Sequence, residues 1–397
     1  MSSSQNPALR VGPPADEGQR SELVEILSQC FRADTESIDR TAKLAGEGNL
    51  RVVSSGERVL GGLWHLPMGQ SFGGRVVPTV GIAGVGIDPA HRGQRAASTL
   101  MAGSMAELHQ QGVALSTLYP ATLPLYRGAG YELAGDRWKI SLPLGSLGLR
   151  DTEPALRMGG PEDFAAMEEC YGRFARQRAG SLDRCQYIWT RLREPKTGSV
   201  RHYVVEEDGR MEGYVTLMQV DGDSGAFFDL SLPDAVANSP GAARRLLAFL
   251  SGHASMSGDV TLYGSALHPL VALVPEWRAK VTLDLPWMLR IVHVQAALAA
   301  RGYPRGLSAE LHLDVADEVL AGNAGPQILR IENGVGRVEP GGHGTLPLHI
   351  RGLAALYSGR ASPEDLRLAG LAQGSAEDWA AAAAVFAGPA PVMSDFF

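Results

Sequence analysis

Residues 80–131 read VGIAGVGIDPAHRGQRAASTLMAGSMAELHQQGVALSTLYPATLPLYRGAGY, and the rest of the chain is organised around them. An extended apolar segment, residues 80–87, ends at Asp88-Pro89, because proline fixes its own φ and restricts the residue before it. The polar run HRGQR then leads into a pattern typical of one helix face, with apolar residues at three- and four-residue steps. These positions are Ala97, Leu100, Met101, Met105 and Leu108.

The helix closes at Gln111-Gly112, and a second strand over residues 113–118 precedes a short helix or turn that carries Tyr126. The basic turn, residues 91–95, suits an anion, because free N–H groups and the helix dipole meet there. A phosphate or pyrophosphate is one interpretation, and solvated arginines on an ordinary turn are the other. A Walker P-loop is excluded because no GxxxxGK[ST] is present, and a dinucleotide fingerprint is disfavoured because the glycines lie inside the strand.

Residues 88–97 resemble the acyl-CoA pyrophosphate loop of the GNAT N-acetyltransferases, Arg/Gln-x-x-Gly-x-Gly/Ala. Three further segments resemble the Eis-like (enhanced intracellular survival) branch of that family: LYPATLPLYRGAGYE at 118–132, WMLRIV at 287–292 and MSDFF at 393–397. One residue departs from the pattern. Arg95 stands where the loop starting at Arg92 is expected to have glycine, so its side chain either adds a phosphate contact or crowds the site.

The resemblance implies an α/β (α+β) chain in which tandem GNAT-like mixed-sheet domains precede a sterol-carrier-protein-like α+β domain. We predict domains at residues 1–148, 149–290 and 291–397. In the second, from Leu156, the strand and helix pattern restarts, but the pyrophosphate loop is absent, which favours a structural copy without cofactor. Residues 288–300 are predicted to be helical, and the alternating strands and helices after them are assigned to the third domain as scaffold.

Composition narrows the class of protein further. Of the 397 residues, 45% are hydrophobic and 20% charged, as in globular chains. The formal net charge of −7 argues against a general nucleic-acid or anionic-membrane surface. Three cysteines without CxxC spacing favour a reducing compartment, and neither a signal peptide nor an apolar run of membrane-spanning length is visible, so we predict a cytoplasmic location. The ten histidines are scattered without metal-ligand spacing, and no metal is predicted.

Acetyl transfer from a thioester to an amine requires that the acyl donor be held. The backbone of Val85, Gly86 and Ile87 is predicted to pair with the pantetheine arm as an added strand does. The turn and the helix start are predicted to hold the pyrophosphate, and the resemblance extends the acetyl-CoA site to the start of the Tyr126 helix. The residues concerned are Arg92, Gly93, Gln94, Arg95, Ala96, Ala97, Ser98, Ala121 and Thr122.

The resemblance also assigns the proton transfers. Tyr126 matches the family's general acid, and a phenol of pKa ~10 can protonate a departing thiolate. Tyr119 and Tyr131 are predicted to be packing residues. The family's base is the C-terminal carboxylate, here that of Phe397, and Asp395 is the other candidate carboxylate.

The sequence therefore predicts an acetyl-CoA-dependent N-acetyltransferase in which a primary amine attacks the thioester directly. The resemblance implies aminoglycoside-like, small-amine or lysine acceptors and a homohexamer. The alternative is a non-catalytic protein that binds acyl-CoA or a lipid on a degenerate GNAT scaffold.

Overall fold

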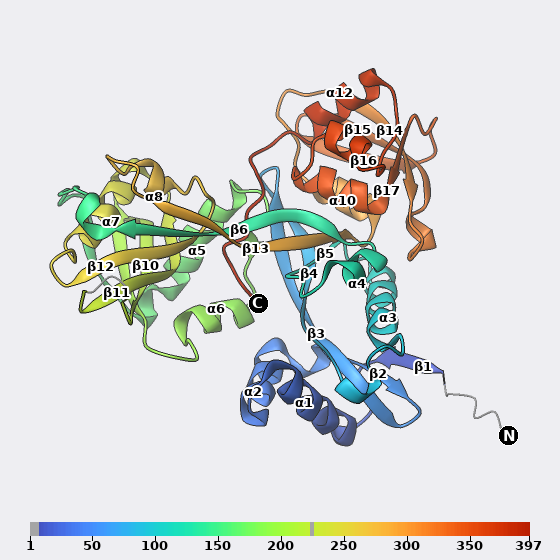
Figure 1. Ribbon diagram of the computed structural model, residues 1–397. Coiled ribbons are helices and arrows are strands. Elements are labelled where there is room, and N and C mark those ends of the chain that lie inside the picture. Colours follow the sequence, from blue (N-terminus) through green and yellow to red (C-terminus); the bar gives the residue numbers. More distant parts are fainter. Residues whose placement is uncertain (1–7, 223–225) are drawn as a thin grey trace. The chain divides into compact units, whose positions relative to one another are not determined.

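The computed structural model describes residues 8–222 and 226–397, whose elements Figure 1 labels. The chain divides into two compact units. The first comprises the chain up to Ala134, Trp287–Ala390 and Phe397, and the second comprises Gly135–Pro286 and Pro391–Phe396. The last residue thus belongs to a different unit from the six residues before it. The three-domain division at residues 148 and 290 stays a prediction.

The first unit contains a sheet built around the two strands of the opening stretch. Its strands are β1 (Leu9–Gly12), β2 (Leu50–Ser55), β3 (Arg58–Phe72), β4 (Arg75–Ile87), β5 (Leu115–Leu118) and the end of β13 (Lys280–Ile291), in that spatial order. Neighbours from β1 to β4 are antiparallel, whereas β4 and β5 are parallel and are joined through α3 (Ala96–Gln110). The short helix α4 (Leu123–Gly128) follows β5, and β6 (Glu132–Pro143) begins in this unit. The strand–turn–helix–strand prediction is confirmed.

Helices cover both faces of this sheet. On one face lie α1 (Glu17–Phe31) and α2 (Thr35–Ala45), and a Cβ placed on Gly86 of β4 would meet Leu27 of α1. On the other face the apolar side of α3 packs in one buried cluster with Val80 and Ile82 of β4. Successive strand residues point to opposite faces of the sheet. Gly86 faces α1 and lets that helix pack close to the strand, whereas Val80 and Ile82 face α3 and form the core beneath it.

The rest of the first unit is a four-stranded sheet, in the order β16-β15-β14-β17, with its helices. The strands are β14 (Ala309–Ala316), β15 (Gly325–Glu332), β16 (Val335–Pro340) and β17 (Leu346–His349), and the helices are α9 (Val294–Ala300), α10 (Ile350–Ser358), α11 (Pro363–Leu368) and α12 (Ala376–Val385). The sequence Glu332-Asn333-Gly334 predicts a hairpin turn, and Asn333 and Gly334, between the paired strands β15 and β16, both have positive φ, 52° and 81°. Ser362-Pro363 predicts a helix start with serine as N-cap, and Ser362 caps α11, accepting from the Asp365 N–H.

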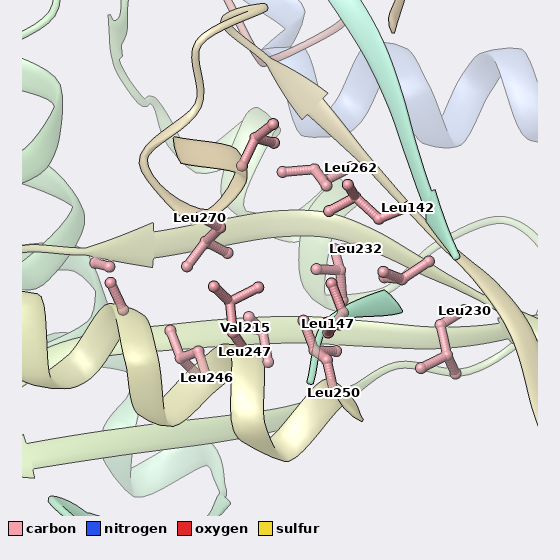
Figure 2. Close-up of a cluster of buried hydrophobic side chains, with 14 of the residues drawn as sticks. Leu142, Leu147, Val215, Leu230, Leu232, Leu246, Leu247, Leu250, Leu262 and Leu270 are labelled. Carbon is pink, nitrogen blue, oxygen red and sulfur yellow. The ribbon is translucent and has the colours of Figure 1, made fainter. Parts of the chain in front are cut away.

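The second unit repeats the plan of a mixed sheet, in the order β6-β12-β11-β10-β9-β7. Its elements are β7 (Ala155–Gly159), α5 (Phe164–Arg176), β8 (Leu182–Asp183), α6 (Gln186–Arg193), β9 (Arg201–Glu207), β10 (Arg210–Val220), β11 (Phe228–Ala237), α7 (Pro240–Ser251), β12 (Ser257–Gly264) and α8 (Pro269–Ala272). Here β11 and β12 are the parallel neighbours, and α7 connects them. Figure 2 shows Leu246, Leu247 and Leu250 of α7 packed against the leucines of this sheet.

Three local predictions are wrong. Residues 287–291 are not the start of a helix but the end of β13, which pairs with β5 from Met288 to Ile291, and α9 begins only at Val294. Met288, Leu289 and Ile291 are all fully buried, and a strand buried on both faces has no alternation to distinguish it from a helix. The spacing of Leu23, Ile26, Leu27 and Phe31 predicts one buried face for a helix over residues 20–31, but Phe31 is 48% exposed and lies outside that face of α1. No helix is predicted where α2 lies. Among the described helices none is long and apolar enough to cross a membrane.

Candidate active site

The two parallel strands of the first unit separate part-way along their length. Pairing joins residues 79–81 of β4 to residues 115–117 of β5 and goes no further. β4 continues to Ile87, and its other edge stays paired with β3 as far as Gly61. In the described part of the chain, residues 82–87 therefore have no strand on the β5 side. Their backbone groups are open to a ligand that adds as a strand, and Val85, Gly86 and Ile87 lie in this segment.

A β-bulge at Gly84 accompanies the separation. The register between β3 and β4 shifts here, since Gly62 pairs with Gly86 but Trp64 pairs with Ala83. Gly84 has φ 60°, and a Cβ on it would lie 1.7 Å from Cζ3 of Trp64. Only glycine fits this position, because the backbone is left-handed and because a Cβ would overlap the Trp64 indole. A bulge bends its strand, and this one bends β4 at the beginning of the unpaired segment.

The turn after β4 leads to a helix start without a side-chain cap. Arg92, Gly93, Gln94 and Arg95 are all exposed, and Arg95 occupies the N-cap position of α3. The earliest backbone bond of the helix runs from the Thr99 N–H to the Arg95 carbonyl, 2.9 Å away. The N–H groups of the preceding three residues, 96–98, thus lie before the hydrogen-bonded ladder, next to two exposed guanidinium groups. This arrangement suits a pyrophosphate.

Arg95 adopts the conformation that the missing glycine would adopt. Its φ is 63° and its ψ is 7°, which is left-handed. The predicted departure from the loop pattern therefore changes the side chain without changing the backbone path. The exposed Arg95 side chain makes no ion pair among the described residues, so its charge is available to a phosphate.

The equivalent helix start in the second unit is closed. Ser239 is the N-cap of α7, and its side chain accepts a hydrogen bond from the Ala242 N–H, 3.0 Å away. Pro240 at the first helical position has no N–H to offer. Of the three N–H groups that stay open at α3, the equivalents at Pro240 and Ala242 of α7 are absent and occupied, respectively. This difference supports a structural role for the second unit.

Tyr126 lies in α4, which begins after the exposed pair Ala121 and Thr122. The residue is 5% exposed and packs in the buried cluster under α3. Among the described residues its hydroxyl has no hydrogen-bond partner. Burial raises the pKa of Tyr126 above its ordinary value. The phenol therefore keeps its proton at neutral pH.

Tyr131 lies beside it and has a different environment. The two rings meet edge to face, with centroids 6.2 Å apart. The Tyr131 hydroxyl lies 2.7 Å from Oγ of Ser116, and the Ser116 hydroxyl donates to the carbonyl of Val80. Tyr131 is fully buried and its polar atom is satisfied, as a packing residue requires.

Phe397 lies on the opposite face of β4 from Tyr126. It is 9% exposed, and a Cβ placed on Gly81 would lie 2.9 Å from Cε2 of its ring. Tyr119 meets the ring edge to face at 5.8 Å. Since Gly81 points away from the Val80 and Ile82 side of the strand, where Tyr126 packs, the two predicted proton-transfer residues flank the strand beside the separation.

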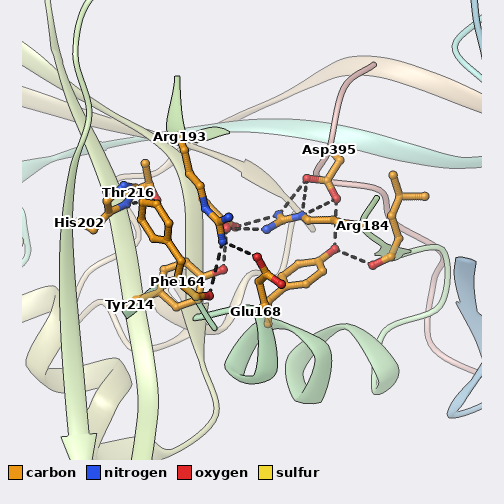
Figure 3. Close-up of polar contacts among 11 residues, drawn as sticks. Phe164, Glu168, Arg184, Arg193, His202, Tyr214, Thr216 and Asp395 are labelled. Carbon is orange, nitrogen blue, oxygen red and sulfur yellow. Dashed lines mark hydrogen bonds and ion pairs between the residues drawn. The ribbon is translucent and has the colours of Figure 1, made fainter. Parts of the chain in front are cut away.

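Asp395, the other candidate base, lies in the second unit. Its carboxylate is 2.8 Å from Nη2 of Arg184, and both side chains are buried. Asp395 is thus engaged in an ion pair of the second unit (Figure 3), whereas Phe397 lies in the first unit beside β4.

A charged bridge that no sequence pattern predicts lies next to Tyr126. Glu132 of β6 accepts from Arg127 of α4 at 2.7 Å and from Arg351 of α10 at 2.5 Å. These three residues line an open cavity of about 480 Å³. Glu132 is 6% exposed, and although burial raises the pKa of its carboxyl, the two arginines and the Leu133 N–H lower it overall. Nothing in the spacing of these residues along the chain marks them as partners.

The comparisons with known proteins agree with this geometry. Residues 13–134 and 180–291 match two models that are both described as an acetyltransferase (GNAT) domain, and residues 294–394 match a sterol carrier protein domain. An uncharacterized N-acetyltransferase of Streptomyces griseus is 30% identical over 317 residues, 72% of this chain and 74% of the relative. The chain belongs to the GNAT N-acetyltransferases. The Eis-like assignment is supported as well, since the GNAT domains precede a sterol carrier protein domain as that branch requires.

Solved structures extend the GNAT assignment over the full length. A GCN5-related N-acetyltransferase from Anabaena variabilis is 38% identical, with a TM-score of 0.93, and the match covers 98% of this chain and 100% of that one. One from Kribbella flavida is 31% identical, with a TM-score of 0.87 and complete coverage of both chains. Eis1 from Mycobacterium abscessus, at 21% identity and a TM-score of 0.81 over 98% of this chain and 100% of its own, shares the fold. This chain is thus an acetyltransferase whose GNAT domains imply acetyl-CoA as acyl donor and an amine as acceptor.

Proposed function

We propose that the first unit transfers an acetyl group from acetyl-CoA to a primary amine by direct attack, with Tyr126 as acid and the α-carboxylate of Phe397 as base. The observation that supports this most directly is the separation of β4 from β5, with Tyr126 on one face of β4 and Phe397 on the other. The unpaired edge at Val85, Gly86 and Ile87 accommodates the pantetheine arm. The pyrophosphate binds at the open start of α3 and beside Ala121 and Thr122.

The steps balance without a covalent enzyme intermediate. The neutral amine attacks the thioester carbonyl, the C–N bond forms and the C–S bond breaks. The nitrogen gives a proton to the Phe397 carboxylate, and the thiolate takes one from the Tyr126 hydroxyl. Proton exchange with water then returns a proton to the Tyr126 phenolate and removes one from the Phe397 carboxyl group, which restores the starting state. A terminal carboxyl of pKa ~3.5 is a weak base, so this role requires desolvation that raises its pKa, or a water that relays the proton.

The acceptor class, the assembly and the location follow the resemblance. We infer aminoglycoside-like amines, small amines or lysine side chains as acceptors, a homohexamer, and a cytoplasmic enzyme. The names of the relatives, which are N-acetyltransferases, favour this proposal over the alternative of a non-catalytic acyl-CoA or lipid binder.

Two variants test the acid. Replacing Tyr126 by phenylalanine removes only the hydroxyl, and we expect turnover to fall by about 10²–10⁴-fold while acetyl-CoA affinity is kept. The matched control is Tyr131→Phe, which removes a hydroxyl from the neighbouring ring and should keep turnover. Thiol release over a panel of amines and calorimetry with acetyl-CoA measure the two quantities. Unchanged turnover in Tyr126→Phe would remove this residue from the mechanism.

The base is tested by adding one glycine after Phe397. One residue moves the carboxylate by up to about 3.5 Å, beyond the tolerance of a proton transfer. We expect turnover to collapse while the melting temperature stays constant, and an equal extension at the N-terminus serves as control. A fully active extended chain would refute the role of the terminal carboxylate.

A further inference from the structure

The open cavity of the first unit combines a pair of arginines with an apolar wall. Its volume of about 480 Å³ lies in the range of small-molecule sites. On its polar side, Glu132 of β6 joins Arg127 of α4 to Arg351 of α10. The other side is mainly apolar and consists of Leu133, Ala355, Ala361, Leu366, Ala369 and Leu371. A ligand that fills this cavity therefore needs a charged end and an apolar body.

The bridge leaves hydrogen-bond donors unused. Arg127 donates Nε and Nη2 to one oxygen of Glu132, at 3.1 and 2.7 Å, and Arg351 donates the same two atoms to the other oxygen, at 2.9 and 2.5 Å. Neither Nη1 has a hydrogen-bond partner in residues 8–222 and 226–397. The two side chains are 38% and 26% exposed, so the two N–H groups on each Nη1 are within reach of a ligand in the cavity.

The lining of the cavity has an excess of positive charge. It contains three guanidinium groups, those of Arg127, Arg351 and Arg360, and two carboxylates, those of Glu132 and Asp365. Burial by itself would raise the pKa of the Glu132 carboxyl, but the arginines on both sides hold it below its ordinary value, so this group is charged at neutral pH. Asp365 is engaged in the capping box of α11. One further negative charge would therefore balance the lining.

We propose that this cavity binds a small organic monocarboxylate, whose carboxylate pairs with the unused donors of Arg127 and Arg351 and whose hydrocarbon body lies against the apolar wall. An arginine pairs with carboxylate and phosphate alike, but a phosphate group carries about 1.5 to 2 negative charges at neutral pH, more than the excess here. The site contains none of the residues to which we assign a role in acetyl transfer. The inference therefore goes beyond the proposed function and does not depend on it.

Hexanoate is the probe, and hexanamide, which has the same body without the charge, is the matched control. Calorimetry on the full-length protein at low salt should give a Kd for hexanoate of about 1 mM or tighter, and hexanamide should bind at least about tenfold more weakly. Because a ligand that binds only the native state stabilises it, the melting temperature should rise with hexanoate concentration. Saturating CoA should leave the affinity for hexanoate unchanged, since the pyrophosphate is expected at α3.

Three variants locate the site. Arg351→Met removes one guanidinium and leaves a balanced Arg127–Glu132 pair, and it should weaken hexanoate binding by about tenfold or more. Arg367→Met removes an exposed arginine of α11 that does not line the cavity, and it should keep the natural affinity. Ala369→Phe places a ring at an exposed position of the wall and should also abolish binding, which keeps the test open if Arg351→Met does not fold.

Four results would overturn the proposal. Hexanoate might not bind at 10 times the expected Kd, or hexanamide might bind equally well, which would leave no role for the charge. Inorganic phosphate that binds as tightly as hexanoate would leave no role for the apolar body. Displacement of hexanoate by CoA, or full affinity in both Arg351→Met and Ala369→Phe, would place the ligand elsewhere on the protein.

Discussion

The backbone at Arg95 allows a prediction that separates strain from charge. A left-handed conformation costs a residue with a Cβ about 1–2 kcal/mol, and Arg95 adopts it at φ 63°. Glycine avoids this cost but loses more freedom on folding, by roughly 0.5–1 kcal/mol. Arg95→Gly should therefore be more stable than Arg95→Ala by about 1 kcal/mol, because both variants lose the guanidinium and only alanine keeps the strain.

Urea unfolding followed by fluorescence measures this difference, which corresponds to about a fivefold change in the unfolding constant. Arg95 is exposed, so neither variant removes packed side-chain contacts that would obscure the comparison. An alanine variant as stable as the glycine variant would refute the left-handed start of α3. The path of the turn, and with it the open N–H groups of residues 96–98, would then need revision.

The same two variants show how much the charge of Arg95 contributes to the affinity for acetyl-CoA. Both should bind acetyl-CoA about tenfold more weakly than the natural chain, the loss expected for a charge-assisted bond to phosphate, and the deficit should shrink as salt rises. Calorimetry at two salt concentrations gives the affinities. If Arg95→Gly instead bound acetyl-CoA more tightly, Arg95 would be crowding the pyrophosphate, the other interpretation of its departure from the loop pattern.

Two further predictions concern stability. Burial, and secondarily Arg51, lower the pKa of His65 to about 4. The unfolded chain therefore takes up a proton on His65 near pH 6.5, before the folded chain does, so the free energy of unfolding decreases as the pH falls from 6.5 towards 4. The decrease is about 2 kcal/mol at pH 5. Urea midpoints at pH 7.5 and 5 should therefore differ less in His65→Leu than in the natural chain, and equal pH dependence would contradict the assignment. Gly130, at φ 85°, lies against the buried Arg290, whose Cζ is 2.6 Å from the position of an added Cβ, so Gly130→Ala should cost at least about 2 kcal/mol. Gly128→Ala, in open space two residues earlier, is the control and should be neutral in the same unfolding assay.

Most of the first unit could be predicted from the sequence because its signals are local. The apolar spacing of α3, the Gly73-Gly74 turn and the Asn333-Gly334 hairpin each depend on a few adjacent residues, and all are confirmed. The end of β13 could not be predicted in this way. Its residues are buried on both faces, so tertiary pairing with β5 alone distinguishes this apolar run from a helix.

In the candidate site, too, the features with a local sequence signal could be predicted and the others could not. The loop residues and Tyr126 follow one another within the opening stretch, and their motif could be read directly. The bulge at Gly84 has a local signal, a glycine inside a strand, but its cause is the indole of Trp64 from another strand. The Arg127–Glu132–Arg351 bridge and the Arg184–Asp395 pair join positions 219 and 211 residues apart, and no local pattern relates them.

The two helix starts are the reason why we propose a cofactor site in one unit and none in the other. Ser239-Pro240 is a complete N-terminal signature that supplies an acceptor and removes a donor, so α7 satisfies its own first turn. Arg95-Ala96 supplies no such acceptor, and α3 leaves its donors open beside exposed cations. A helix start that is incomplete by itself is the one that a ligand completes, and here the incomplete start lies at the separation of β4 and β5. The second unit has the same plan, but the start of its helix is capped by its own sequence.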